Sequence, residues 1–341
     1  MILIEKNEEL FELHKKVMSE KIILEIDKIL SKPYKQLKEK RVKITIRIKK
    51  LLNHIKDNID DYVIADIESQ MNLIKYFITY YDELTTSYKP KSSKPNIYLL
   101  IRYLFENRGY TELTKGFEYE DEVGKKKIYS AYLFVRLLNL KTCPYCNRNY
   151  ISLIEKETKD DKQRRPDLDH FHPKSIFPFL AVNFYNLIPS CSTCNKLKSD
   201  DISLKLIHPY NSKVNDMKIT YWLNDMKFYH TKDITFDSTN SIDIEIENMP
   251  EINKQVFQVE RLYQEHKDIV IELILKHLHY PSTYIKELSD FGYSKKEIYR
   301  FVFSNYLEEN EFSKRPLAKL TRNIAEELGL LDYMDDEDIT S

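Results

Sequence analysis

The sequence CPYC at residues 143–146 and the sequence CSTCNKLK at residues 191–198 enclose the segment on which the rest of the chain is organised. The four cysteines of these two CxxC pairs are all the cysteines in the 341-residue chain. A CxxC turn directs two thiolates at one ion, and two such turns complete the tetrahedral sulfur set that Zn²⁺ prefers. A redox function would leave the second pair unexplained. The pattern predicts a structural zinc ion, with no open position for substrate, held by Cys143, Cys146, Cys191 and Cys194.

Between the cysteine pairs, the sequence DLDHFHPKS occupies residues 167–175. Asp169 offers a hard oxygen ligand directly beside His170, which can accept a proton near neutral pH. A phosphodiester hydrolase needs a divalent metal to stabilise negative charge and a base to activate water. Carboxylate and amide oxygens suit Mg²⁺ or Mn²⁺. Asn195, immediately after the last cysteine, is therefore a candidate for a second ligand of a catalytic Mg²⁺ or Mn²⁺.

Other polar residues of the segment are candidates for supporting roles. Asn186 is placed to hydrogen-bond the loop that carries His170 and so to decide which ring nitrogen is free. If the chain is extended there, His172 shares a face with His170, and either ring suits the base; we assign the base to His170. The candidates for contact with nucleic-acid phosphates are Lys174, Lys196, Lys198 and His172.

The order of these motifs resembles the HNH nuclease family, which has a ββα-metal fold on a zinc-bound, treble-clef-like scaffold. The order is CxxC, then DH followed by a proline three residues later, then NL, then CxxCN, and it covers about residues 141–210. The resemblance implies that His170 is the general base, that Asp169 and Asn195 bind the catalytic metal, and that Asn186 orients the histidine loop. Ser199 stands where many members carry a glycine.

A looser resemblance concerns one subgroup of that family. The sequence HFHPKS at 170–175 looks like bacterial defence-associated HNH proteins, including the nuclease subunit of Septu-type systems and related retron effectors. The sequences HPY at 208–210 and KRPL at 314–317 are similar to the same subgroup. The resemblance implies an antiphage effector.

Charge is distributed unevenly along the chain. The formal net charge is −1, so no general basic excess indicates nucleic-acid binding. Residues 31–50, however, contain nine Lys or Arg against one acid, Glu39. Alternating apolar residues from Val42 to Ile48 fit a strand, while Ile44, Ile48, Leu52 and Ile55 fit a helix. The run is either a solvated helix face or a stripe that contacts phosphates, and both interpretations stay open.

The fold class that we expect is mainly α with a small α+β insert. We expect an N-terminal helical region at 1–138, an HNH module at 139–210 and a C-terminal α+β and helical region at 211–341. Residues 218–222 and 242–246 have strand character, whereas 127–140 and 255–278 are each expected to be one helix, and 89–95 a linker. No apolar run is long enough for a membrane span, so we expect a cytoplasmic protein.

These observations favour a metal-dependent endonuclease that hydrolyses DNA. Cleavage of RNA such as tRNA by the same site remains an alternative, because hydrolysis by activated water needs no 2′-hydroxyl. A zinc-stabilised nucleic-acid-binding module without catalysis is the other alternative. The chain contains no GxxxxGK[ST] sequence, so any ATP dependence would have to come from a separate ATPase subunit.

Overall fold

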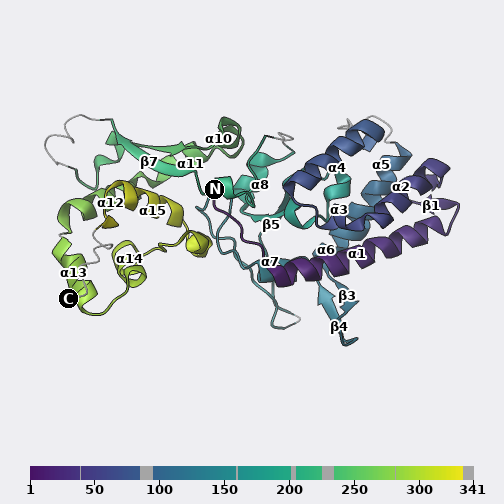
Figure 1. Cartoon of the computed structure of the whole chain (residues 1–341), viewed down its shortest axis with the longest axis horizontal. Coiled ribbons are helices and arrows are strands. Elements are labelled where there is room, and N and C mark those ends of the chain that lie inside the picture. The colour runs from purple at the N-terminus through teal and green to yellow at the C-terminus, as the bar shows by residue number, and fades with distance from the viewer. Residues whose placement is uncertain are drawn as a thin grey trace.

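The computed structural model shows an elongated molecule (Figure 1), with the N-terminal helices at one end, the C-terminal region at the other, and β5 and α8 between them. One cluster of buried apolar side chains extends through all three regions, from Met1 to Leu331. No helix among the described residues is both long and apolar enough to cross a membrane. The structure describes residues 1–38, 40–84, 95–158, 160–200, 205–224, 234–280 and 282–332. The expected linker, apart from its last residue, lies outside these ranges.

The N-terminal region is built on the long helix α1 (Glu8–Leu30). Asn7 caps this helix by accepting a hydrogen bond from the Leu10 N–H at 2.8 Å. Leu10, Val17, Ile22 and Ile26 recur at helical spacing and are buried, which fixes the face that α1 presents to its neighbours. Those neighbours in the N-terminal region are α2 (Ile46–Asp57), α3 (Ile59–Val63), the π-helix η2 (Tyr103–Tyr110) and α7 (Ala131–Leu138). The other helical elements of the region are α4 (Ile67–Tyr80), the 3₁₀ turn η1 (Asp82–Leu84), α5 (Asn96–Arg102) and α6 (Thr111–Lys115).

The basic run at residues 31–50 contains both a strand and a helix. The strands β1 (Tyr34–Gln36) and β2 (Arg41–Lys43) form an antiparallel hairpin. The strand pattern ends there because the Thr45 hydroxyl accepts a hydrogen bond from the Ile48 N–H, which begins α2 at Ile46. The alternating pattern therefore corresponds to a strand in the first part of the run, and the helical pattern corresponds to a helix in the second part.

Two expected helices are shorter than predicted. Residues 126–129 form strand β4 (Lys126–Tyr129), paired with β3 (Phe117–Glu120), and Ser130 then caps α7. The expected helix at 255–278 is broken at Gln258, whose φ of 50° lies in the left-handed region. Apolar periodicity continued across both breaks, so it could not reveal them.

The expected strands at 218–222 and 242–246 are confirmed as β7 (Lys218–Leu223) and β8 (Ile242–Glu247), which pair antiparallel. The fold is mainly helical with small antiparallel sheets, as predicted. The last helix packs against β7. The described residues of this region form the helices α10 (Glu251–Phe257), α11 (Val259–Tyr263), α12 (Lys267–His279), α13 (Ser282–Asp290), α14 (Lys295–Phe303) and α15 (Ala318–Glu327), with 3₁₀ turns at Ser212–Val214, Ser238–Ser241, Gln264–His266 and Glu309–Lys314.

The C-terminal region is attached to the first CxxC turn through Asn147. The Asn147 carbonyl accepts a hydrogen bond from the Leu317 N–H at 2.6 Å, and its Oδ1 accepts one from the Lys319 N–H at 3.1 Å. Its Nδ2 donates to the Phe312 carbonyl at 2.9 Å. The KRPL sequence at 314–317 therefore ends at a contact with the cysteine-bearing turn.

Candidate active site and metal centre

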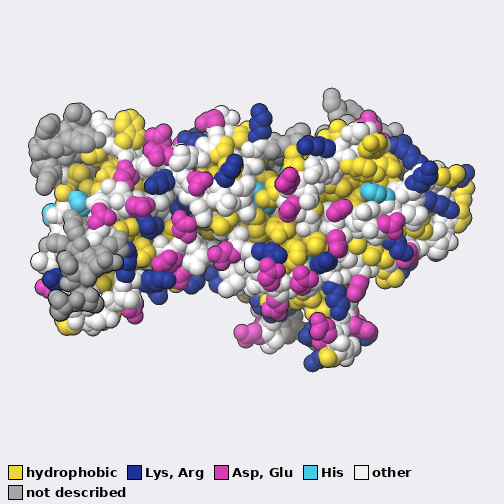
Figure 2. Space-filling view, viewed as in Figure 1, with side chains coloured by type: hydrophobic (Ala, Val, Ile, Leu, Met, Phe, Trp, Pro, Cys, Tyr) yellow, Lys and Arg dark blue, Asp and Glu magenta, His cyan; other side chains and the backbone are white. Residues whose placement is uncertain are grey.

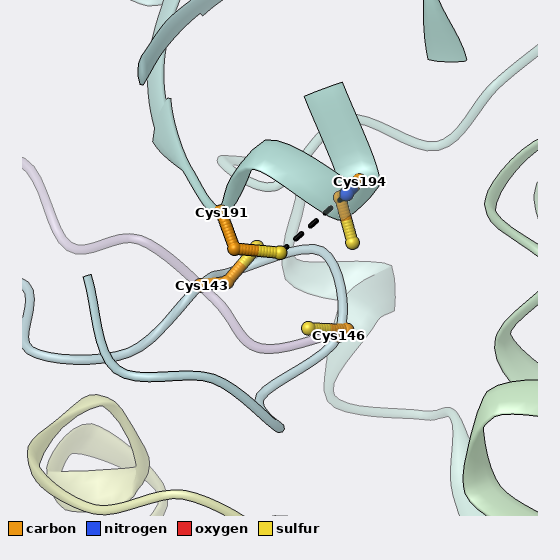
Figure 3. Close-up of side chains that lie close together, drawn as sticks. All are labelled: Cys143, Cys146, Cys191 and Cys194. Atoms are coloured by element: carbon orange, nitrogen blue, oxygen red, sulfur yellow. Dashed lines mark hydrogen bonds between the residues drawn. The ribbon is translucent and has the colours of Figure 1, made fainter. Parts of the chain in front are cut away.

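The four cysteines converge on one point although they come from two distant segments. Cys143 and Cys146 lie in the turn after α7, and Cys191 and Cys194 lie at the start of helix α8 (Ser192–Lys198). Their sulfur atoms all lie within 4.8 Å of one another, and all four residues are buried (Figure 3). Burial raises the pKa of the Cys143 thiol, so a set of thiolates here would need a cation to neutralise it. The cluster can hold a metal ion such as zinc.

A short strand pair and a helix carry the rest of the site. Strand β5 (Asp167–His170) pairs antiparallel with β6 (Leu187–Ser190), and His170 stands opposite Leu187. Helix α8 follows β6 directly and packs on β5. The connection between the strands contains two 3₁₀ turns, η3 (Pro178–Leu180) and η4 (Phe184–Asn186). The strand pair thus places β5 beside α8, with Asp167 next to Asn195 and the His170 carbonyl next to Lys198.

The imidazole of His170 is held in one orientation. Its Nε2 lies 3.0 Å from the Ala181 carbonyl oxygen, which can only accept, so Nε2 carries the proton and Nδ1 is left as the acceptor. The ammonium of Lys174 lies 3.4 Å from Nδ1. Burial lowers the pKa of His170 well below its usual range, and the charge of Lys174 lowers it further. The ring is therefore neutral at pH 7, with Nδ1 able to accept a proton.

Asn186 fixes the backbone of the loop that supplies the Ala181 carbonyl. Its Oδ1 accepts a hydrogen bond from the His172 N–H at 2.6 Å. Its Nδ2 donates to the His172 carbonyl at 3.1 Å and to the Leu180 carbonyl at 2.9 Å. Since Asn186 is fully buried, these three bonds have no competition from water.

Asp169 is nearly buried and both of its oxygens are engaged. Oδ2 accepts a hydrogen bond from the Tyr145 hydroxyl at 2.6 Å. The Lys198 ammonium lies 3.2 Å from Oδ2 and 3.3 Å from Oδ1, and it also donates to the His170 carbonyl at 2.8 Å. Burial raises the pKa of Asp169, while Lys198 and Tyr145 oppose that shift. The side chain of Lys198 has no exposed surface, so in this structure it is an internal partner of Asp169 and does not face solvent as an open phosphate contact would.

Asn195 is oriented by a residue that the sequence analysis did not single out. Its Nδ2 donates to Asp167 Oδ2 at 3.2 Å, which fixes which side of the amide carries the oxygen. Asp167 lies two residues before Asp169 on β5, and this spacing along a strand puts both carboxylates on the same face. That i, i+2 relationship is the signal in the sequence by which Asp167 could have been found.

A cavity of about 490 Å³ opens onto these residues. It is lined by Asp167, Asp169, His170, Lys174, Asn195 and Lys196, together with Tyr110, Arg165, Leu168, Pro173, Ser199 and Asp200. His172 is not among them: it is buried between the rings of Phe171 and Phe177, and burial lowers its pKa to about 4. Because β5 ends at His170, strand alternation does not continue, and the two histidines do not share a face.

The N-terminal region forms part of the wall of this cavity. The ring of Tyr110, at the end of η2, meets His170 edge-on with centroids 4.4 Å apart, and Lys174 Nζ lies 4.7 Å above the Tyr110 ring. His14 Nε2 lies 2.7 Å from the Val182 carbonyl oxygen. Gly109 packs so closely that a Cβ there would lie 2.5 Å from a methyl group of Val182. These contacts join residues far apart in sequence, so no local pattern predicts them.

Comparison with known proteins gives one limited similarity. Septu protein PtuB from Bacillus thuringiensis is 33% identical to this chain over 82 residues. These residues are 23% of this chain and 28% of that protein, so the similarity spans less than a third of either. No protein-family model matches the chain, and no solved structure matches it.

Proposed function

We propose that this protein is a metal-dependent HNH endonuclease that hydrolyses phosphodiester bonds in DNA. The observation that carries the proposal is the neutral His170, whose Nδ1 is turned away from the Ala181 carbonyl in a cavity also lined by Asp169 and Asn195. An unprotonated base beside oxygen donors is what hydrolysis by activated water requires. Two antiparallel strands followed by a helix, with cysteines at both ends of the segment, are the elements that the HNH resemblance implies.

Each residue of the candidate site has its own role in this proposal. Nδ1 of His170 takes a proton from the attacking water, and the hydrogen bond from Nε2 to Ala181 keeps the ring in place as the charge forms. Lys174, beside Nδ1, and the exposed Lys196 attract the phosphate. Asn186 positions the loop that holds the ring. Tyr110 and the β5 backbone keep bulk water off one side of the imidazole.

Asp169 and Asn195 would hold Mg²⁺ or Mn²⁺, with Asp167 orienting the amide. One carboxylate and one amide oxygen are hard donors of the type that these ions prefer, and they leave other positions for water. The Lys198 ammonium beside Asp169 indicates that the position accommodates positive charge. When bound, the ion supplies the positive charge that stabilises the transition state and the leaving oxygen. The four cysteines would hold a structural zinc.

The biological role that we propose is antiphage defence. The similarity to Septu protein PtuB supports it, together with the HFHPKS sequence at 170–175. Because the sequence has no P-loop motif, ATP dependence would come from a separate ATPase subunit.

The test is cleavage of plasmid DNA and of bulk tRNA by the purified protein with Mg²⁺, with Mn²⁺ and with EDTA. His170→Ala is compared with His172→Ala as a matched control, and zinc content is measured in both. We expect metal-dependent cutting of DNA that His170→Ala abolishes. Cutting of tRNA alone would make the protein a ribonuclease, and cutting that survives in His170→Ala would contradict the site assignment. A protein that binds DNA equally well with either substitution and cuts nothing would be a binding module.

A further inference from the structure

The β1–β2 hairpin and the start of α2 form a surface of one charge sign at the end of the molecule (Figure 2). We name it the basic surface. Its residues carry nine positive charges against one acid within residues 31–50, so the rest of the chain has a net charge of −9, which is −1 minus +8. All nine are exposed except Lys35, which is half-buried. The nine are Lys32, Lys35, Lys38, Lys40, Arg41, Lys43, Arg47, Lys49 and Lys50.

The acids near the basic surface do not neutralise it. Glu83 pairs with Arg47 at 3.0 Å, and Asp27 pairs with Lys56 at 2.6 Å. Apart from Arg47, the basic side chains of the basic surface make no ion pair with any residue that the structure describes. An ordinary solvated helix face mixes both signs at i, i+4 spacing. An exposed cluster of one sign repels itself and gains most when a polyanion covers it.

The π-helix η2 connects the basic surface to the candidate active site. At one end of η2, Lys174 Nζ lies 4.7 Å above the Tyr110 ring in the cavity wall. At the other end, Lys35 Nζ lies 4.5 Å above the Tyr103 ring. Tyr103 and Tyr110 are the first and last residues of this helix, so their Cα atoms lie roughly 10 Å apart along its axis. Duplex DNA rises about 3.4 Å per base pair, so about three base pairs span this axial distance.

We infer that the basic surface binds the phosphate backbone of the DNA duplex whose scissile phosphate occupies the His170 cavity. Its role in cleavage rests on the proposed function, whereas its affinity for DNA does not. The contact is to phosphates, so it positions the duplex without reading its sequence. It also concentrates positive charge on one surface of a chain whose net charge is −1.

The test compares two quadruple charge reversals made in the His170→Ala chain. One changes Lys38, Lys40, Arg41 and Lys43 of the basic surface to Glu, and the other changes the exposed Lys213, Lys218, Arg261 and Lys286 of the C-terminal region to Glu. Both alter the net charge equally. We measure the Kd for a 30-base-pair duplex over a range of salt concentrations. The basic-surface variant should bind at least tenfold more weakly, with a salt slope smaller by about 3 to 4 because about four phosphate contacts are lost. The control should bind as its parent does.

Equal binding by the two variants would overturn the inference. A version with Gln at the same four basic-surface positions, with circular dichroism, separates lost charge from a damaged hairpin. Weakened binding of vesicles containing phosphatidylglycerol, or of tRNA, with unchanged binding of the duplex would assign the surface to that other partner and overturn the inference as well.

A second comparison uses chains that retain His170. Bis(4-nitrophenyl) phosphate is small enough to occupy the cavity alone, so the basic-surface variant should hydrolyse it at the unsubstituted rate and cut the duplex at least tenfold more slowly. A parallel loss on both substrates would contradict the inference. If the unsubstituted protein hydrolyses neither substrate, the proposed function fails, and the binding comparison still decides whether the surface holds DNA.

Discussion

His170 and Ala181 are joined by a 3.0 Å hydrogen bond from the imidazole Nε2 to the backbone carbonyl. The bond closes the loop between β5 and β6, and Asn186 holds the loop backbone at His172 and Leu180. On the outer side, His14 and Gly109 of the N-terminal region pack against Val182, the next residue. The orientation of the candidate base therefore depends on side chains from two regions of the chain.

The first prediction concerns the pH dependence of cleavage. The base must be unprotonated, and burial and Lys174 both lower the pKa of His170. The rate should therefore persist below pH 6.5 and fall only in more acidic solution. Lys198 also lowers this pKa, so Lys174→Met removes one of three lowering causes, and the acidic limb of kcat/KM should move to higher pH. Lys196→Met is the control, because it removes a cavity lysine that is not adjacent to Nδ1. The acidic limb of kcat/KM for this variant should not move. If the acidic limbs of Lys174→Met and Lys196→Met both coincide with that of the unsubstituted protein, Lys174 does not lower the pKa of His170.

The second prediction concerns Asp167. Asp167→Ala removes the acceptor that orients the Asn195 amide, and loss of such an orienting partner typically weakens metal affinity about 10- to 100-fold. Asp167→Asn retains an acceptor oxygen without the charge and should stay close to the unsubstituted affinity. Titration of Mn²⁺ into each protein, followed by electron paramagnetic resonance, measures the difference. Equal weakening in both variants would mean that the charge of Asp167 matters and its hydrogen bond does not.

The sequence was sufficient to predict those parts of the molecule that depend on short-range patterns. The cysteine cluster and the strands β7 and β8 follow from spacing and from β-branched residues, and the structure contains them. The break at Gln258 was not predictable, because its backbone is left-handed while the apolar periodicity continues past it. Tyr110 was missed for a related reason: its contact with His170 joins residues sixty positions apart.

Lys198 illustrates a different limit of the sequence. A lysine three residues after Asn195 is expected at a phosphate, and nothing in its sequence neighbours marks it as buried. The helix α8 places it on the face that packs against β5, where Asp169 and the His170 carbonyl surround its ammonium. Which lysine faces solvent depended on the docking angle of the helix, and Lys196 is the exposed one.

The third prediction concerns removal of the zinc. The purified protein should contain one zinc ion per chain, and the double substitution Cys191→Ser and Cys194→Ser should contain none. Without the ion the two CxxC turns lose their common anchor, and the contact of Asn147 with Leu317 and Lys319 should loosen with them. Structural zinc contributes on the order of 10 kcal/mol in small domains, so unfolding should begin at a markedly lower temperature. Added Mg²⁺ should not restore the original unfolding temperature. Unchanged thermal unfolding in zinc-free protein would contradict a structural role.

The last prediction concerns Ser199, at the end of α8, where many HNH proteins carry glycine. Its φ of 46° and ψ of −131° are costly for a residue with a Cβ and are ordinary for glycine. Ser199→Gly should therefore stabilise the fold by about 1 kcal/mol, less the added entropy of glycine in the unfolded chain. That gain corresponds to a rise in Tm of roughly 1–2 °C for a chain of this size. Ser199→Ala removes the hydroxyl and keeps the Cβ, so it should give no such rise, and an equal rise in both variants would show that the hydroxyl, not the backbone angle, is the source.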